Sequence, residues 1–203
     1  MDVDRAGAYH DSGWSGDVGC LAWCFRVAYR SLALCSGVGM NSETFRDAMA
    51  TLAAPLTVLT YYDSSGRPGG LTVSSVCSLS VAPPRVLFCV NQANQGHAAA
   101  VAASHWCLHV LGPGQEHLAR RFAGAGDRFR GLPVLPGVAP LLAGVAVRIE
   151  LGADEVRDGG DHTILLARVR RVVAPAHGGG LVWYQRGPAT VVPTQSELRG
   201  RIA

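Results

Sequence analysis

Residues 66–91 contain a run of small hydroxyl and thiol side chains that could bind a polar ligand. Thr72, Ser74 and Ser75 can each donate a hydroxyl or amide hydrogen to a phosphate or to the carbonyl edge of a heteroaromatic ring. The preceding pair, Gly69-Gly70, has no Cβ atoms and lets a ligand approach the backbone closely. The same residues are equally typical of a strand whose polar face lies in water, so both interpretations stay open at this point.

A second candidate is the sequence Gly159-Gly160-Asp161-His162, which stands at the turn into a long apolar strand. The functional interpretation places the His162 imidazole at the mouth of a barrel, where it would contact a second ligand. The alternative is an ordinary glycine turn followed by a surface histidine.

A third candidate combines guanidinium groups with aromatic rings. It consists of Arg120, Arg121 and Phe122, followed by Arg128 and Phe129. Guanidinium groups bind phosphate through paired N–H donors, and they also stack on flat rings. These residues therefore suit a ligand with a phosphate and a planar ring. The end of an ordinary helix explains them equally well.

His105, Cys107 and His109 would share one face of a strand, because strand side chains alternate with a period of two residues. These residue types ligate transition metals, but no fourth ligand is in view. A strand that turns Trp106 and Leu108 towards the core explains the segment better, so no metal is expected.

Glycine-rich nucleotide-binding loops are absent from the sequence. No Gly-x-Gly-x-x-Gly run exists, and a chain whose 18 basic residues are all arginine cannot contain the Gly-Lys-Ser/Thr ending of a P-loop. Any nucleotide must be held by other residues.

Composition limits the class of protein. With 203 residues, 48% of them hydrophobic, the chain can form one globular domain. The net charge of +3 is small and the arginines are scattered, so a nucleic-acid partner is not expected. No apolar run reaches the roughly 18 residues of a membrane span. Because six cysteines follow no regular spacing and no signal peptide is recognisable, we expect a cytoplasmic protein with free thiols.

Residues 1–39 differ in pattern from the rest of the chain. They carry Gly, Asp, Trp and Cys without strand alternation, whereas a helix pattern begins after Met40, with Ser42 as a candidate N-cap. We therefore expect residues 1–39 to be an N-terminal extension, either disordered or a mis-assigned start, and residues 40–203 to form one domain.

After this helix, strand-like segments with hairpin signals predominate. The sequence predicts short helices near 97–104 and 115–124 and a hairpin turn at 63–70. The expected strands are 56–62, 71–80, 86–90, 106–111, 145–151, 162–173 and 181–185. Because long helices do not alternate with these strands, the pattern favours a mainly β fold, a closed or nearly closed antiparallel barrel, over a Rossmann sheet.

Taken together, these pieces resemble the short-chain flavin reductases, the FMN-binding split-barrel family. The similarity extends from about Phe45 to Gly187. It rests on GLTVSSVCSLSVAPPRVLFCVN (70–91), RF (121–122), RFRGLP (128–133), the triplet Gly160-Asp161-His162 and YQRG (184–187). Each piece is modest alone, but their order and spacing make the resemblance specific.

The resemblance implies a homodimeric NAD(P)H:flavin oxidoreductase with an antiparallel split β-barrel and a few short helices. Such an enzyme transfers hydride from the nicotinamide C4 of NADH or NADPH to N5 of FMN or FAD, and supplies the reduced flavin to a separate monooxygenase. The resemblance also implies His162 as a catalytic residue that borders the nicotinamide. The implied cofactor-binding residues are Pro68, Gly70, Leu71, Thr72, Ser74, Ser75, Cys89, Val90, Asn91, Gln95, Gly96, Arg121, Phe122, Gly160, Asp161 and His162.

Two departures from the family pattern bear on the flavin. Residues 92–97 replace the run that commonly follows the 86–91 strand, and His109 stands where the family has asparagine. The choice among FMN, FAD and riboflavin, and between NADH and NADPH, therefore stays open. Two alternatives also remain: an oxidase or monooxygenase that keeps its flavin and acts on an organic substrate, and a flavin-binding barrel without turnover.

Overall fold

The computed structural model describes residues 41–174 and 179–192. The chain divides into two units, residues 1–45 and residues 46–203. The expected extension, residues 1–39, lies outside the described residues, so its role stays a prediction. No helix in the described segments is long and apolar enough to cross a membrane.

The first described helix begins with a side-chain cap. The Asn41 carboxamide oxygen accepts hydrogen bonds from the backbone N–H groups of Glu43 and Thr44, at 3.0 and 2.8 Å. Asn41 is therefore the N-cap residue, and the expectation that Ser42 would cap the helix was wrong. Both residue types can cap, and the difference of one position follows from which side chain reaches the free amides.

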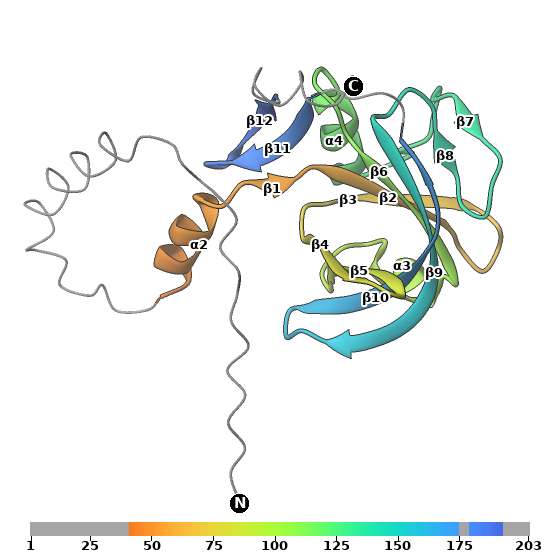
Figure 1. The fold of residues 1–203 in the computed structure, drawn as a ribbon, viewed down its shortest axis with the longest axis horizontal. Helices are drawn as coiled ribbons and strands as arrows, with labels where there is room; N and C mark the ends of the chain where they lie inside the picture. The colour runs from red at the N-terminus through yellow and green to blue at the C-terminus, as the bar shows by residue number, and fades with distance from the viewer. Residues whose placement is uncertain (1–40, 175–178, 193–203) are drawn as a thin grey trace, which may run out of the picture. The chain divides into compact units, whose positions relative to one another are not determined.

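The described residues form short helices and many strands (Figure 1). The helices are α2 (Ser42–Ala50), α3 (His97–Ala102) and α4 (Glu116–Ala123). The long strands are β2 (Thr57–Tyr62), β3 (Pro68–Val73), β4 (Val76–Val81), β5 (Pro84–Asn91), β6 (His105–Val110), β9 (Val147–Asp158) and β10 (His162–Val173). The smaller strands are β1 (Ala54–Pro55), β7 (Val134–Leu135), β8 (Leu141–Leu142), β11 (Gly180–Tyr184) and β12 (Gly187–Val191).

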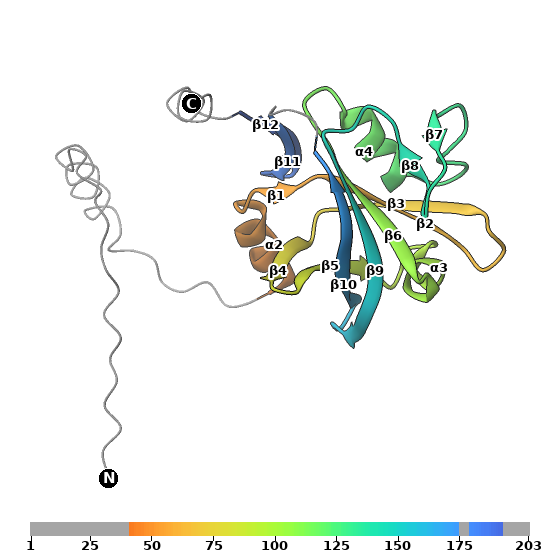
Figure 2. The same cartoon turned by 45° about the vertical axis from the view of Figure 1, so that its right-hand side comes forward.

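The seven long strands form one sheet in the order β3-β2-β6-β9-β10-β5-β4, and every neighbouring pair is antiparallel. The two edge strands, β3 and β4, follow each other in the chain and are joined by Ser74 and Ser75 alone. The sheet is therefore curved enough to bring its two edges together at this link (Figure 2). The expected mainly β, antiparallel class is confirmed. Among the described strands, no backbone ladder between β3 and β4 closes the sheet into a barrel.

The sequence located most of these strands. Strand β10 has the predicted bounds, and β5 and β6 differ from prediction by a residue or two at each end. Strand β11 was predicted as 181–185, but the other strands of the smaller sheets were missed, above all β12, which pairs with β11. Its sequence, Gly-Pro-Ala-Thr-Val, contains a proline and few large apolar residues, so no strand pattern stands out.

Two hydrophobic cores lie on opposite sides of the sheet. The inner core includes Leu59, Phe88, Trp106, Leu108 and Leu165. The Phe88 and Trp106 rings meet edge to face with centroids 5.6 Å apart, and the Trp106 indole N–H donates to the carbonyl of Ala100 in α3 at 2.8 Å. Each such fully buried side chain contributes roughly 1.5–3 kcal/mol to folding.

The second core lies between the outer side of the sheet and α4. Val58 of β2 and Leu56, the residue just before this strand, pack there with Leu118 and Phe122 of α4. Because Val58 enters this core and its neighbour Leu59 enters the inner core, both sides of β2 are buried. This region of the sheet is thus fixed from both sides.

Candidate functional site

Four of the predicted site residues, Ser75, Cys89, Asn91 and His162, lie together on the outer side of the sheet. The Cys89 N–H donates to the Ser75 carbonyl at 3.2 Å, and the Ser75 hydroxyl donates to the Cys89 carbonyl at 3.1 Å. Asn91 in β5 is paired with His162 in β10. Burial alternates along both strands, and these residues belong to the sets that face away from the inner core.

We call this surface the open face. It consists of Ser75, Cys77, Leu87, Cys89, Asn91, His162, Ile164 and Leu166, from β4, β5, β10 and the link before β4. Beside it lies a cavity of about 510 Å³, the β4 pocket. The pocket is lined by Ser74, Ser75, Val76, Cys77, Leu87 and Cys89, and by Met49 and residues 52–55. Apolar walls with hydroxyl groups at one edge suit a planar heteroaromatic ligand.

The turn between β9 and β10 lies at one end of the open face. The Gln92 backbone N–H donates to the Asp161 carbonyl at 3.0 Å, and its side-chain amide donates to the Gly160 carbonyl at 2.9 Å. Gly160 has a φ angle of +80°, a left-handed conformation that favours glycine. The structure therefore holds Gly160, Asp161 and His162 next to the end of β5.

His162 is oriented by its neighbour. Its Nδ1 atom lies 2.7 Å from the Asp161 carboxylate, and 39% of the His162 side chain is exposed. This hydrogen bond, together with the attraction of the imidazole, lowers the pKa of the Asp161 carboxyl below its usual value. Because the Nδ1 edge is taken, Nε2 is the ring nitrogen left for a ligand.

An ion-pair cluster closes the opposite end of the open face. Asp154 accepts a hydrogen bond from Arg168 at 2.9 Å and forms an ion pair with Arg85, while Glu155 accepts a hydrogen bond from Arg85 at 2.9 Å. The hydrogen bond from Arg168 is the main cause that lowers the pKa of Asp154. These arginines are therefore neutralised by the protein itself and fix β5, β9 and β10 to one another.

The outer side of β3 is covered rather than open. A Cβ atom on Gly70 would lie 2.7 Å from the Phe122 ring, and the Gly70 carbonyl accepts from Arg128 at 2.6 Å. The Thr72 hydroxyl donates to the Ala119 carbonyl at 2.7 Å. Phe122 is 0% exposed. We call this region, the outer side of β2, β3 and β6 beneath α4, the covered face.

Arg121 also belongs to this internal framework. Its Nε donates to the Arg128 carbonyl at 2.7 Å, and its Nη2 donates to the Arg130 carbonyl. These bonds tie α4 to the following loop and occupy donors that a phosphate would need. In this structure Arg121 is a structural residue, as is Phe122 beside it.

The remaining predicted residues fall into two groups. Leu71 and Val90 point into the inner core and are 2% and 1% exposed, so they present only backbone atoms to a ligand. Pro68 lies exposed at the start of β3, and Gln95 lies exposed in the loop after β5. Gly96 packs against Tyr61, whose hydroxyl donates to the Gly96 carbonyl at 2.9 Å. The structure does not bring these last three onto the open face.

Two asparagines order the loop after β5, where the sequence departs from the family pattern. The Asn91 carboxamide oxygen accepts from the Ala93 N–H at 2.8 Å, and that of Asn94 accepts from the Gly96 N–H at 2.9 Å. His97 then lies 2.8 Å from the Thr163 hydroxyl, measured from its Nε2. The replaced run is therefore a hydrogen-bonded turn attached to β10.

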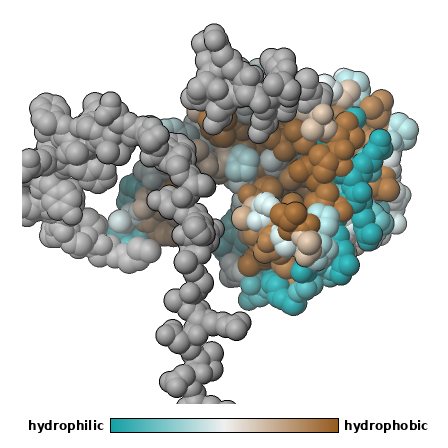
Figure 3. Space-filling model, in the orientation of Figure 1, coloured by the Kyte–Doolittle hydropathy of each residue, from teal (hydrophilic) through white to brown (hydrophobic). Residues whose placement is uncertain are grey.

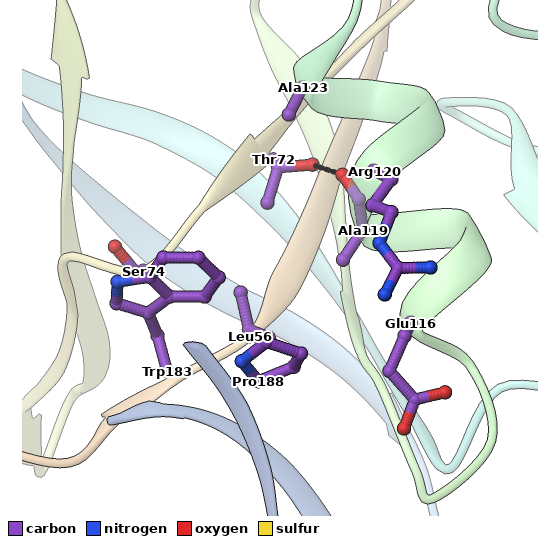
Figure 4. Close-up of a pocket in the computed structure, with 9 residues that line it drawn as sticks. All are labelled: Leu56, Thr72, Ser74, Glu116, Ala119, Arg120, Ala123, Trp183 and Pro188. Carbon is purple, nitrogen blue, oxygen red and sulfur yellow. Dashed lines mark hydrogen bonds between the residues drawn. The ribbon is translucent and has the colours of Figure 1, made fainter. Parts of the chain in front are cut away.

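A second cavity, of about 370 Å³, lies on the other side of Ser74 between α4 and β11, and we call it the α4 pocket (Figure 4). Ser74 lines both pockets. The α4 pocket also contains Arg120 and Trp183, which sequence analysis did not separate from their neighbours. Helical periodicity could have distinguished Arg120 from Arg121, because Glu116 and Arg120 are one turn apart on the same side of α4.

The histidine and cysteine trio of β6 does not form a metal site. Within the described segments, no group of three or more His, Cys, Asp or Glu side chains could hold a metal ion. Cys107 and His109 are buried, and burial raises the pKa of Cys107 to about 12 and lowers that of His109 to about 4. His109 joins strands instead: its Nδ1 lies 3.1 Å from the Val58 carbonyl, and its Nε2 accepts from the Leu142 N–H at 3.0 Å.

Known proteins are similar to this chain in sequence and in fold. Residues 49–191 match the family described as Flavin reductase like domain. The NADH:riboflavin 5'-phosphate oxidoreductase of Streptomyces pristinaespiralis is 36% identical over 165 residues, covering 78% of this chain and 93% of that protein. The 4-hydroxyphenylacetate 3-monooxygenase reductase component of Pseudomonas aeruginosa is 32% identical over 153 residues, covering 72% and 89%. The NADH:FAD oxidoreductase of Streptomyces globisporus, in complex with NAD and FAD fragments, has a TM-score of 0.71 and 30% identity, covering 76% of this chain and 95% of that chain.

Proposed function

The chain belongs to the flavin reductase like domain family, and we infer that it is an NAD(P)H:flavin oxidoreductase. It transfers a hydride from the nicotinamide C4 of NADH or NADPH to N5 of FMN or FAD, so that the nicotinamide is oxidised and the flavin, which also takes up a proton, is reduced. The flavin supplies the electron-accepting ring. The relatives named above as NADH-dependent reductases support this assignment.

The observation that carries the proposal is the open face with its pocket. Ser74, Ser75 and Cys89 line the β4 pocket, which suits the isoalloxazine ring and its carbonyl edge. Asn91 and His162 lie further along the same surface, where the nicotinamide would lie over the flavin. Hydride transfer mainly requires the reacting atoms to be held about 3–3.5 Å apart, and no strong general base is needed.

The predicted site residues then take different roles. Gly160, Asp161 and His162 would border the nicotinamide, with Asp161 holding the His162 ring in place. Leu71 and Val90 would contact the flavin only through the backbone. Gly70, Thr72, Arg121 and Phe122 would act through packing, because they fix β3 against α4. Pro68, Gln95 and Gly96 remain candidates for the distal end of the flavin.

We also propose the split-barrel form of the fold. The seven-stranded sheet has its edge strands joined end to end through Ser74 and Ser75, without a ladder between them among the described residues. The β4 pocket lies at that opening. A barrel that is split at this place would expose the polar backbone of the link to a ligand.

A homodimer is a further part of the proposal. Large apolar side chains are exposed on edge strand β4, at Leu79 (45%) and Val81 (86%), and at Met49 and Leu52, which line the β4 pocket. Figure 3 shows hydrophobic residues exposed on this face of the strand-rich unit, with hydrophilic residues along its edge. Exposed large apolar side chains are typical of interfaces, and a second copy would cover them.

The reduced flavin would leave for a separate monooxygenase. Two supports for this are the relative named as a monooxygenase reductase component and the open β4 pocket, which would let a flavin come and go. A cytoplasmic location stays a prediction from the sequence.

Steady-state oxidation of NADH and NADPH, with FMN, FAD and riboflavin added in turn, tests this function. We expect oxidation that depends on added flavin and saturates with it. Oxidation without added flavin, by a protein that remains yellow after purification, would support the flavoenzyme that keeps its flavin. Absence of oxidation under every condition would overturn the assignment and leave a binding role.

A further inference from the structure

The α4 pocket combines an aromatic ring, a guanidinium group and apolar walls. Figure 4 shows Trp183 on the side away from α4, Arg120 and Glu116 on the α4 side, and Leu56 and Pro188 between them. The Thr72 hydroxyl, bonded to the Ala119 carbonyl, ties the β3 wall to the helix wall. A cavity of about 370 Å³ falls in the range of about 300–1,000 Å³ that is typical of small-molecule sites.

Arg120 is available to a ligand, in contrast to its neighbours. The guanidinium groups of Arg121 and Arg128 donate hydrogen bonds to backbone carbonyls of the loop and of β3. In the part of the chain that the structure describes, the Arg120 guanidinium makes no ion pair or hydrogen bond, and it lines the pocket. Guanidinium groups bind phosphates through paired, charge-assisted hydrogen bonds. Arg120 therefore indicates an anionic group in the ligand.

Trp183 provides a surface for stacking. Its side chain is 42% exposed and lines the pocket. Nucleic-acid bases stack on aromatic side chains, and any base can do so because each has a flat π face. Glu116, one turn before Arg120, can only accept hydrogen bonds when ionised, so it suits ribose hydroxyls or an amino group. A base, a sugar and a phosphate together match this set of side chains.

The position of the pocket connects it to the proposed flavin site. Ser74 lines the α4 pocket and the β4 pocket, so a ligand that occupies both passes this residue. On the basis of the proposed function, we propose that the α4 pocket binds an adenosine diphosphate group, the part that FAD and NADH share and FMN lacks. Trp183 stacks on the adenine, Arg120 binds the phosphates and Glu116 accepts from the ribose. These three residues then set the affinity for the substrate whose adenylate the pocket takes.

The first test is equilibrium binding of ADP to the full-length protein and to the variants Trp183→Ala and Arg120→Gln. Each variant should weaken ADP binding by about five- to tenfold. The matched controls are Tyr184→Ala, next to Trp183 but outside the pocket lining, and Arg130→Gln, an exposed arginine outside it. The controls should bind ADP like the unchanged protein. Equal binding by all variants, or no ADP binding by any, would overturn the proposal.

The second test identifies the source of the adenosine diphosphate by steady-state kinetics. One set of assays compares FMN with FAD as the hydride acceptor. A second set compares NADH with reduced nicotinamide mononucleotide, which lacks the adenylate, as the hydride donor. If the KM for FAD rises in Trp183→Ala while that for FMN does not, the pocket takes the flavin's adenylate. If the KM for NADH rises with either flavin while that for the mononucleotide does not, it takes the adenylate of NADH. Unchanged KM values in every assay would overturn the proposal.

These two tests separate the inference from the proposed function. A protein that binds ADP through Trp183 but oxidises no nicotinamide with any flavin would contradict the oxidoreductase and leave the pocket assignment standing. A protein that reduces flavins while its variants bind ADP normally would contradict the pocket assignment and leave the oxidoreductase function standing.

Discussion

The open face and the covered face are parts of one outer surface of the same sheet, yet they differ in what lies on them. On the covered face, α4 buries Gly70 and Phe122, and arginine side chains bind backbone carbonyls. On the open face, Ser75, Cys89 and His162 point outward beside a cavity. Strand alternation is the same in both. The difference teaches that a covering helix turns one half of the surface into core and leaves the other half uncovered.

The largest expected effect is on the covered face. Phe122→Ala removes a fully buried ring from the second core, and such changes cost about 3–5 kcal/mol of folding free energy. Leu87→Ala on the half-buried open face is the matched comparison and should cost clearly less. Urea unfolding of both variants measures this. An equal loss of unfolding free energy in the two variants would contradict the claim that only the covered face is part of the core.

The buried His109 gives the covered face a pH dependence. Burial lowers its pKa in the folded protein to about 4, from an ordinary value of about 6.5. Because only the unfolded chain takes up a proton between these values, folding stability should fall as the pH drops from about 6.5 to about 4, and by about 3 kcal/mol in all. Above the ordinary value, His109 should contribute no slope.

Unfolding free energies measured across that pH range test this, with His109→Gln as the comparison. The variant is expected to be less stable near neutral pH, because the bonds to Val58 and Leu142 are changed, and to show a shallower acid slope. The same slope in both proteins would assign the acid sensitivity to other groups.

On the open face, His162→Ala should affect activity rather than stability. The side chain is partly exposed and lies outside both cores, so its removal should leave the melting temperature unchanged. Loss of a contact to the nicotinamide should lower kcat/KM for NADH by about tenfold, or about 1.4 kcal/mol. His105→Ala, another exposed histidine, is the control. A variant with full activity would remove His162 from the site.

The smallest effect should come from Asp161→Asn. An exposed charged pair contributes little, so the loss of the carboxylate that orients His162 should lower kcat/KM for NADH only about two- to threefold. In the background of His162→Ala, the same change should have no further effect. A loss in that background as large as in the unchanged protein would mean that Asp161 acts independently of His162.

The sequence predicts the strands well because their apolar alternation is a local property. The resemblance names Ser75, Cys89 and His162 as ligand contacts; the structure places them on the outer side of the sheet, and their contact with a ligand stays a prediction. The sequence does not predict which outward residues α4 covers, because that depends on contacts between segments far apart in the chain. For this reason Phe122 and Arg121 were expected at the ligand but lie in the framework, and His109 was expected on a strand face but bridges β2 and β8.

Arg120 and Trp183 are the opposite case, because the fold brings them together although the sequence did not indicate that they would meet. They come from α4 and β11, and only the folded chain brings them to one cavity with Ser74. Helical spacing points to the side of α4 that carries Arg120, but no local pattern indicates that Trp183 faces it. Their separation in the sequence is more than sixty positions.

The most direct test of the account is FMN binding to a protein whose open face is blocked. In Cys89→Trp the new side chain would project from the open face into the β4 pocket, and in Ala143→Trp it would enter a separate cavity of about 350 Å³ near β8. With folding of both variants verified by circular dichroism, we predict that FMN binds Ala143→Trp like the unchanged protein. Cys89→Trp should bind it at least about a hundredfold more weakly. Equal FMN affinity in Cys89→Trp would contradict the assignment of the open face as the flavin site.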